Sequence, residues 1–515
     1  KINMADHKVL ITTSGIGSRL GKLTDFTNKS LVRIGDKPAI SHIIEHYPKD
    51  TSFVITLGHF GSYVKEFLKL AYPNKDFTFI KVNNFEGSGS SLGHSILQAK
   101  AELQCPFIFH ASDTILTELD TIPNLNHNWC AGAYKEETSQ YRTLRINNGL
   151  VDAINEKGEI NFDYSYIGLC GIKDYKLFWS NLENLPNTHS LSDVHVINKM
   201  LNNVTFSFHK INNWLDIGNT NELDKTRKYF GSSIKVLDKD NESIYFFNDF
   251  VIKFFSDSNI NKNRIKRASK LKGLVPNMLD STLNFYKYKK AEGNLFAESV
   301  NENTFKSFLE WTKNNLWKSK VSNNFNSKCL DFYINKTNKR IDQYLDGKID
   351  TPEIINGELI PPIYEILSEI DTEWLCEGTP VQFHGDFILD NVIETEDGFS
   401  LIDWRQDFAN DLEVGDIYYD LAKLNHNLRV NHDIVDKKLF GSSPKNCYIL
   451  CNSTLIRCRE VLHKFIIENG YDLKKVEVLS SIIWINMAPL HEYPFNKFLF
   501  NFGKYNLYKT LKNVS

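Results

Sequence analysis

The chain has 515 residues, of which 42% are hydrophobic and 24% are charged, and its formal net charge is −3. A chain of this length exceeds one hydrophobic core and is expected to form roughly two to four folding units. The near balance of charge excludes the basic excess typical of nucleic-acid-binding proteins. With scattered cysteines, no signal peptide and no apolar run of about 18 residues, we expect a cytoplasmic protein that binds neither nucleic acid nor a membrane.

Short apolar runs alternate with helix-like stretches in the first 230 residues. This alternation predicts an α/β domain with a parallel, Rossmann-like sheet. Ligands of such sheets bind at the carboxyl ends of the strands, and polar turns follow Thr13 and His110 at two such ends. The apolar runs that we interpret as strands cover residues 8–13, 51–58, 77–83 and 106–112.

The first polar turn contains glycine and positive charge. Gly15 and Gly17 directly follow the first strand, and Arg19 and Lys29 come next. Glycine lets backbone N–H groups approach a phosphate. Arginine and lysine neutralise phosphate charge and the charge that develops during displacement. A tight strand-to-helix turn is the alternative interpretation.

The segment "SGIGSRLGKLTDFTNKSL" (14–31) resembles the signature of the sugar-phosphate nucleotidyltransferases, a glycine-rich turn followed by Arg-Leu, Leu-Thr and Pro-Lys. The resemblance implies that Gly15, Gly17 and Ser18 bind a nucleotide and that Arg19 and Lys29 are catalytic. Thr13-Ser14 replace the usual small pair before the glycine. Asn28 replaces the family's proline, and we expect it to loosen the loop that carries the lysine.

Further matches to this family follow in the same order, in "EGSGSSLGHSI" (86–96), "HASDTI", "INEKG", "YSYIGLCGI" and "NNWLDIGNTNEL". The chemistry implied is attack of a phosphate monoester on the α-phosphorus of a nucleoside triphosphate, with Mg²⁺ held by two carboxylates. The resemblance covers about residues 8–225. The residues it implies are Gly87, Ser88 and Gly89 at the base, Glu156, Lys157 and Gly168 at the substrate, and Asp113 and Asp216 as metal ligands.

The pattern changes near residue 230. Two β-like runs joined by a polar hairpin come first, and the sequence is mainly helical after about residue 303. We place a domain boundary between residues 228 and 242. This gives one domain over 1–230 and a second over 242–515, with a small lobe at about 242–295 and a helical large lobe at about 296–515.

The second domain contains "HGDFILDNVIETEDGFSLIDWR" (384–405), which resembles the catalytic segment of the aminoglycoside phosphotransferase and choline kinase superfamily. The resemblance implies a two-lobed, protein-kinase-like α+β fold. Asp386 would deprotonate a substrate hydroxyl, and Asn391 and Asp403 would bind Mg²⁺ on ATP. We expect His384 to brace the loop and Asp416 to be structural.

The small lobe matches this superfamily less well. Lys253 stands at a strand position suited to binding the ATP phosphates. The preceding hairpin, "LDKDNESIY", has no glycine, and the following helix, "NKNRIKRASKLKG", has no glutamate to pair with Lys253. We interpret that positive helix as a solvated face.

Together the two resemblances imply a bifunctional enzyme that uses Mg²⁺ at both sites. ATP would phosphorylate a small sugar or polyol, and a second nucleoside triphosphate, CTP or UTP, would supply a nucleotidyl group. The NDP-activated product would serve surface polysaccharide such as capsule. Choline or another amino alcohol is an alternative acceptor, with Trp374, Trp404, Tyr418 and Tyr419 as candidates for an aromatic cage. A kinase-like module that only regulates is a second alternative. The oligomeric state stays open.

Overall fold

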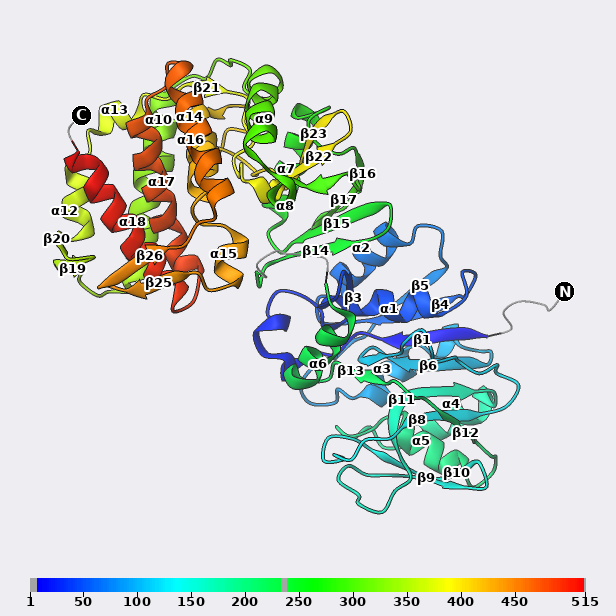
Figure 1. The fold of residues 1–515 in the computed structure, drawn as a ribbon. Coiled ribbons are helices and arrows are strands. Elements are labelled where there is room, and N and C mark those ends of the chain that lie inside the picture. Colours follow the sequence, from blue (N-terminus) through cyan, green and yellow to red (C-terminus); the bar gives the residue numbers. More distant parts are fainter. Residues whose placement is uncertain (1–6, 233–238, 514–515) are drawn as a thin grey trace. The chain divides into compact units, whose positions relative to one another are not determined.

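The computed structural model describes residues 7–232 and 239–513, which fall into two compact units (Figure 1). The first unit comprises Lys1–Ser258 and Asp280–Lys287, and the second comprises Asn259–Leu279 and Tyr288–Ser515. This division differs from the boundary placed from sequence, which assigns residues 242–258 and 280–287 to the second domain. Their packing, described below, explains the difference.

A mixed sheet of nine strands, in the order β5-β4-β1-β6-β11-β8-β12-β10-β9, organises the first unit. β1 pairs in parallel with β4 and β6, and β4 with β5, so the predicted parallel α/β arrangement is confirmed for this half of the sheet. β11 runs antiparallel to β6 and β8. The strands are β1 (Lys8–Thr12), β4 (Phe53–Leu57), β5 (Phe77–Lys81), β6 (Phe107–Ala111), β8 (Trp129–Ala133), β9 (Thr143–Asn147), β10 (Leu150–Asn155), β11 (Tyr164–Ile172) and β12 (Ser207–Lys210).

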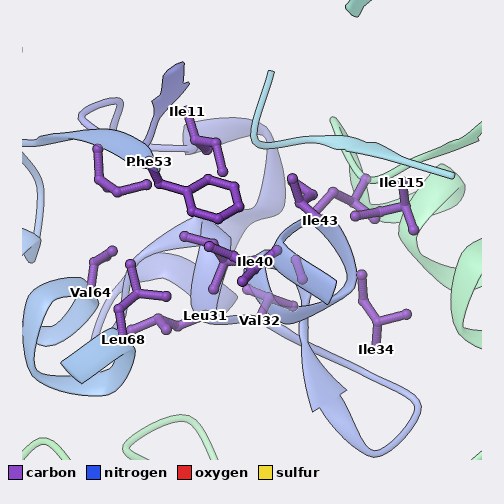
Figure 2. Packing of buried hydrophobic residues seen from close by; sticks show 14 of the residues in the cluster. Ile11, Leu31, Val32, Ile34, Ile40, Ile43, Phe53, Val64, Leu68 and Ile115 are labelled. Atoms are coloured by element: carbon purple, nitrogen blue, oxygen red, sulfur yellow. The ribbon is translucent and has the colours of Figure 1, made fainter. Parts of the chain in front are cut away.

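Helices cover both faces of this sheet, which is why its central strands are continuously apolar. Side chains alternate along β1, so Ile11 joins one buried cluster and Leu10 the other. Figure 2 shows the first cluster, in which Ile11 and Phe53 lie near Ile40 of α1. The helices are α1 (Ala39–His46), α2 (Gly61–Ala71), α3 (Leu92–Gln98), α4 (Tyr175–Glu183), α5 (Asp193–Met200) and α6 (Thr220–Phe230).

Strands β14 (Glu242–Phe246), β15 (Phe250–Phe255) and most of β17 (Phe285–Lys289) pack against the first unit. The Tyr245 hydroxyl donates to the Leu31 carbonyl at 2.6 Å, and its ring lies 5.4 Å from that of Phe67 on α2. The rings of Tyr63 and Phe254 are 5.0 Å apart. Burial of these aromatic rings makes the strands part of the same hydrophobic core.

The second unit is predominantly helical, as expected after about residue 303, and α17 lies against α14 and α18 (Figure 1). Its helices are α7 (Ser258–Lys270), α8 (Phe296–Ser299), α9 (Glu302–Asn315), α10 (Phe325–Leu330), α11 (Lys336–Leu345), α12 (Ile363–Ser368), α13 (Thr372–Cys376), α14 (Ile417–Asn427), α15 (His432–Asp436), α16 (Ser453–Glu468), α17 (Leu473–Met487) and α18 (Phe495–Lys512). Its strands include β18 (Asn294–Leu295), β19 (Glu353–Ile355), β20 (Glu358–Ile360), β21 (Pro380–Val381), β22 (Val392–Thr395), β23 (Gly398–Leu401), β24 (Gly415–Asp416), β25 (Phe440–Ser443) and β26 (Asn446–Ile449). Within residues 7–232 and 239–513, no helix has both the length and the apolar character needed to cross a membrane.

Candidate active sites

The glycine turn after β1 leads into the 3-10 helix η1 (Ser18–Thr24). Gly17 has φ +71°, and a Cβ there would lie 3.0 Å from Cβ of Lys29, so both the backbone angle and the space require glycine. A Cβ at Gly15 would meet no atom within 4 Å. Arg19, one residue into η1, is exposed.

Asn28 anchors the loop that carries Lys29, so the expectation that it loosens this loop is wrong. Its side-chain NH₂ donates to the Thr13 carbonyl at 2.8 Å and to the His59 carbonyl at 2.6 Å. Its Oδ1 accepts from the backbone N–H of Ser30 at 2.9 Å. A buried amide that satisfies its donors and acceptor in this way fixes the loop to the end of β1.

Two short strands, β7 (Thr114–Ile115) and β13 (Leu215–Asp216), bring the predicted metal ligands to one place. They pair antiparallel, with Asp216 opposite Thr114, the residue that follows Asp113. The Ile217 N–H also donates to the Asp113 carbonyl at 3.1 Å. The strand pairing therefore brings together two carboxylates that lie about a hundred residues apart in sequence.

Positive charge surrounds Asp113. Lys29 Nζ lies 2.7 Å from Asp113 Oδ2. Burial alone raises the pKa of Asp113, but Lys29 and Arg19 outweigh it and hold the pKa below its ordinary value. Partial burial of the otherwise exposed Lys157 lowers its pKa, and Arg19 and Arg142 lower it further. Within residues 7–232 and 239–513, the side chains of Arg19 and Lys157 form no ion pair, so both are available to an anionic ligand.

Asp216 is held differently. The Tyr141 hydroxyl donates to Asp216 Oδ2 at 2.8 Å, and the Gly218 N–H donates to Oδ1 at 2.8 Å. Burial and the charge of Asp113 raise the pKa of Asp216. A neighbouring like charge has this effect, and a bound cation would relieve it. Tyr141 was missed from sequence because it lies in a loop outside every recognised motif.

Lys135 was not predicted from sequence either. Its ammonium lies 2.7 Å from Glu222 Oε2, 4.5 Å from the ring centre of Trp214 and 5.0 Å from that of Tyr141. The protein's own cation therefore contacts both aromatic rings beside Asp216.

The remaining predicted residues of the first site lie on loops and on one strand. Gly87, Ser88 and Gly89 form a largely exposed loop before α3, in which the Ser88 carbonyl accepts from Asn84 at 2.9 Å. Glu156 is exposed and lies 3.4 Å from Arg142 Nε. Gly168 sits in an irregular stretch of β11 with φ +72°, where a Cβ would come within 2.8 Å of Ala111.

The donor set of this site fits magnesium. Asp113 and Asp216 supply hard oxygen donors, which Mg²⁺ prefers, and Mg²⁺ completes its coordination with water and substrate phosphates. No group of three or more His, Cys, Asp or Glu residues suited to a metal occurs in the part of the chain that the structure describes.

In the second unit, His384 braces the predicted catalytic loop. Its ring is fully buried, with Nε2 bonded to the Ile402 carbonyl at 2.8 Å and Nδ1 accepting from the Asp386 N–H at 3.2 Å. Burial lowers the pKa of His384 to about 4. Asn391 donates to the Asp386 carbonyl at 2.8 Å and to its carboxylate at 3.2 Å.

Two buried carboxylates lie at the start of α14, and one of them, Asp420, supports this loop. Asp420 accepts from the backbone N–H of His384 at 2.9 Å and of Gly385 at 2.8 Å. Asp416, which we expected to be structural, caps α14 and accepts from the Tyr333 hydroxyl at 2.7 Å. Burial raises the pKa of Asp416 to about 6. Asp420 was not recognised from sequence.

The predicted base Asp386 and the predicted metal ligand Asp403 each contact a cation of the protein. Lys423 Nζ lies 2.8 Å from Asp386 Oδ1. The Arg264 guanidinium pairs with Asp403, whose backbone has the left-handed φ of +52°. Non-glycine residues in this region are strained and cluster at functional sites.

The interpretation of α7 as a solvated face is wrong for two of its residues. Arg264 pairs with Asp403, and Arg267 is 1% exposed. Arg267 donates to the carbonyls of His384 at 3.1 Å and Leu412 at 3.2 Å. Arg267 therefore holds the predicted catalytic loop, and Arg264 pairs with a predicted metal ligand. Helical spacing of three residues places both on one face.

Lys253 lies on β15, 5% exposed, with its ammonium 5.6 Å from the ring centre of Phe255. Its strand belongs to the first compact unit, whereas Asp386, Asn391 and Asp403 belong to the second. Its assignment to ATP stays a prediction.

The aromatic residues considered for a choline cage have different neighbours in the structure. Trp374 and Tyr418 both face Lys475, whose ammonium lies 5.5 and 4.6 Å from their ring centres. Trp404 is fully buried and donates to the Arg264 carbonyl at 2.9 Å. A lysine of the chain thus occupies the place that a substrate cation would take between Trp374 and Tyr418.

No protein-family model and no curated protein matches the chain. Several solved structures of nucleotidyltransferases are similar in fold to less than half of it. A putative glucose-1-phosphate thymidylyltransferase from Bacillus anthracis is 20% identical, with 45% of this chain and 98% of that chain covered and a TM-score of 0.39. The CTP:phosphocholine cytidylyltransferase from Streptococcus pneumoniae is 17% identical, with 44% and 99% covered and a TM-score of 0.37. The inositol-1-phosphate CTP transferase from T. maritima is 15% identical, with 44% and 96% covered and a TM-score of 0.37.

Proposed function

We propose that the chain is a bifunctional enzyme. Its second unit phosphorylates a small hydroxylated metabolite with ATP, and its first unit then transfers a nucleotidyl group from CTP or UTP to that phosphate. The product is an NDP-activated precursor for surface polysaccharide. The observation that carries the proposal is the β7–β13 pairing, which joins Asp113 and Asp216 at a site also approached by Lys29, Arg19 and Lys157.

In the first unit, the exposed cations Arg19 and Lys157 bind and screen two anionic reactants. Lys29 is held by the Asn28 loop, so its charge is positioned before the substrate arrives. The phosphate oxygen of the acceptor forms the new bond to the α-phosphorus as the bond to pyrophosphate breaks. Magnesium, when bound by Asp113 and Asp216, neutralises charge on the reacting phosphates.

In the second unit, Asp386 accepts the proton of the acceptor hydroxyl. That oxygen bonds to the γ-phosphorus as ADP leaves. Asn391 orients the Asp386 carboxylate, and His384 fixes the loop through the Ile402 carbonyl. Asn391 and Asp403 supply oxygen donors suited to Mg²⁺ on ATP.

The test is mass spectrometry of products after the full chain is incubated with ATP, one second nucleotide at a time, and a panel of sugars, polyols and amino alcohols. We expect a phosphorylated acceptor with ATP alone and an NDP-linked acceptor when CTP or UTP is added. A nucleotidyl product formed only from acceptors that are already phosphorylated would reject the kinase half.

A regulatory role for the second unit is the alternative, and the pairing of Arg264 with Asp403 favours it, because a guanidinium there opposes a metal ion. Choline as acceptor is disfavoured at Trp374 and Tyr418, because Lys475 lies against both rings. Titration of ATP binding with and without Mg²⁺ separates the first alternative from catalysis: a regulatory module binds ATP and releases no ADP.

A further inference from the structure

Four cations gather beside the proposed catalytic loop of the second unit. Lys336 and Arg340 are four residues apart on α11, so they lie on one face of it, and Phe332 belongs to the π-helical turn Asp331–Asn335 directly before it. The Lys336 ammonium is 4.1 Å and the Arg405 guanidinium 5.0 Å from the ring centre of Phe332. The fourth cation, Lys423, pairs with Asp386. Phe332 therefore marks a place where charges from separate segments converge.

Among the described residues, carboxylates balance this cluster only in part. Lys423 is paired with Asp386 at 2.8 Å, and Asp407 is the carboxylate that acts on Lys336. Lys336 forms no hydrogen bond or ion pair with any residue in 7–232 or 239–513. Burial lowers its pKa well below the ordinary value, and the neighbouring Arg405, Arg340 and Lys423 lower it further. Buried like charges destabilise one another unless a counter-charge is present.

The cluster lies near Asp386 and its neighbours in the loop. Arg405 is next to that loop, because a Cβ at Gly385 would come within 2.6 Å of Arg405 Cβ. The Arg405 N–H also donates to the His384 carbonyl at 3.0 Å. Asp403, the proposed ligand of the metal on ATP, is instead paired with Arg264. Among the described residues, Lys336 thus has no ion-pair partner near the place where the acceptor hydroxyl would meet Asp386.

We propose that the acceptor of the phosphoryl group carries an anionic substituent, a carboxylate or a phosphate, that binds among Lys336, Arg340 and Arg405 while its hydroxyl meets Asp386. This inference rests on the phosphotransferase function proposed above and narrows its substrate class. It replaces neutral sugars and cationic amino alcohols with hydroxy acids or phosphorylated polyols. Arginine and lysine bind both kinds of anion through charge-assisted hydrogen bonds.

The test compares matched acceptors that differ in charge. The full chain is incubated with Mg²⁺, ATP and one acceptor at a time. The matched pairs are glycerate with glycerol and galacturonate with galactose, and glycerol 3-phosphate and choline are tested as well. ADP release is measured and corrected for the release by the Asp386→Asn variant. We expect kcat/KM to be at least about tenfold higher for the anionic member of a pair. The carboxylates and glycerol 3-phosphate separate the two sources of anion. Preference for a neutral acceptor or for choline would overturn the inference.

Variants of one helix locate the effect. We expect Lys336→Met to raise KM for the anionic acceptor about 10- to 100-fold with KM for ATP unchanged, and Lys336→Arg to restore binding. Lys339→Met is the control, because Lys339 is exposed on the same helix. A rise in KM for ATP would instead assign the cluster to the nucleotide.

Calorimetry with glycerate and with glycerol 3-phosphate separates this inference from the function on which it rests. Failure of all acceptors to give ADP would reject the kinase. The anion site would still be supported if binding is seen and Lys336→Met removes it. Absence of binding by every anion, or equal binding to Lys336→Met, would reject the site.

Discussion

The carboxylates of the two candidate sites have different hydrogen-bond and ion-pair partners. In the first unit, Asp113 pairs with Lys29, whereas Asp216 is held by the neutral hydroxyl of Tyr141. In the second unit, Asp386 and Asp403 both contact cations, Lys423 and Arg264. The first site thus keeps one carboxylate, with a raised pKa, that gains from a metal ion. At the second site, a metal ion would have to displace Arg264 from Asp403.

This difference indicates that the charges around the acidic residues, and not their presence alone, decide how readily each site would bind a metal ion. A carboxylate beside another carboxylate repels its neighbour, and a divalent cation removes that repulsion. A carboxylate that already pairs with arginine is stabilised by that arginine, so a divalent cation stabilises it less. We therefore expect nucleotidyl transfer to need less Mg²⁺ than phosphoryl transfer.

Removal of the proposed base should separate the two activities. We expect Asp386→Asn to reduce ADP release about 10²- to 10⁴-fold, the range over which a general base contributes. Release of pyrophosphate from an acceptor that is already phosphorylated should be unchanged. Loss of both activities would mean that the sites are not independent, and retention of ADP release would exclude Asp386 as the base.

Removal of the Tyr141 hydroxyl should weaken metal binding in the first site. A partner that orients a metal ligand typically contributes 10- to 100-fold, so we expect Tyr141→Phe to lower the rate of pyrophosphate release by about that factor and to raise the Mg²⁺ concentration at half-maximal rate. Tyr134→Phe is the control, because Tyr134 is 63% exposed. An unchanged Mg²⁺ requirement would contradict a role for Tyr141 in positioning Asp216.

Removal of Arg264, the cation that pairs with Asp403, should lower the Mg²⁺ requirement of the second site. We expect Arg264→Met to lower the Mg²⁺ concentration at half-maximal ADP release by about tenfold, because the guanidinium no longer opposes the ion. Lys262→Met, an exposed change on the same helix, should have no effect. A higher Mg²⁺ requirement in Arg264→Met would show that Arg264 supports the site and does not compete with the metal ion.

Loss of the Asn28 amide should have the smallest effect and act on stability. Asn28→Ala removes hydrogen bonds to Thr13, His59 and Ser30, and we expect the free energy of unfolding to fall by about 1–3 kcal/mol. Asn203→Ala, at an exposed position, is the comparison. Thermal denaturation measures both. An unchanged Tm would mean that the loop does not depend on Asn28.

The parts that sequence predicted are those encoded locally. The apolar runs of β1, β4, β5 and β6 lie between polar turns, and their strands form where predicted. The predicted ligands Asp113 and Asp216 do come together, although their metal role stays a prediction. The missed contacts join distant segments: Tyr141 to Asp216 across 75 residues, and Arg264 to Asp403 across 139. No local pattern marks them, because tertiary packing creates them. Asn28 was misjudged because its bonds go to other loops.

The aromatic packing of β14, β15 and β17 on α2 has a practical consequence. The first unit is built from two stretches of chain, up to Ser258 and again over Asp280–Lys287. No single cleavage point therefore releases it intact, and a fragment that stops at residue 230 would expose Tyr63 and Phe67 to water where Phe254 and Tyr245 now cover them. The activity of each unit is best removed by a point substitution within the whole polypeptide, because truncation of one unit would remove residues of the other unit's hydrophobic core.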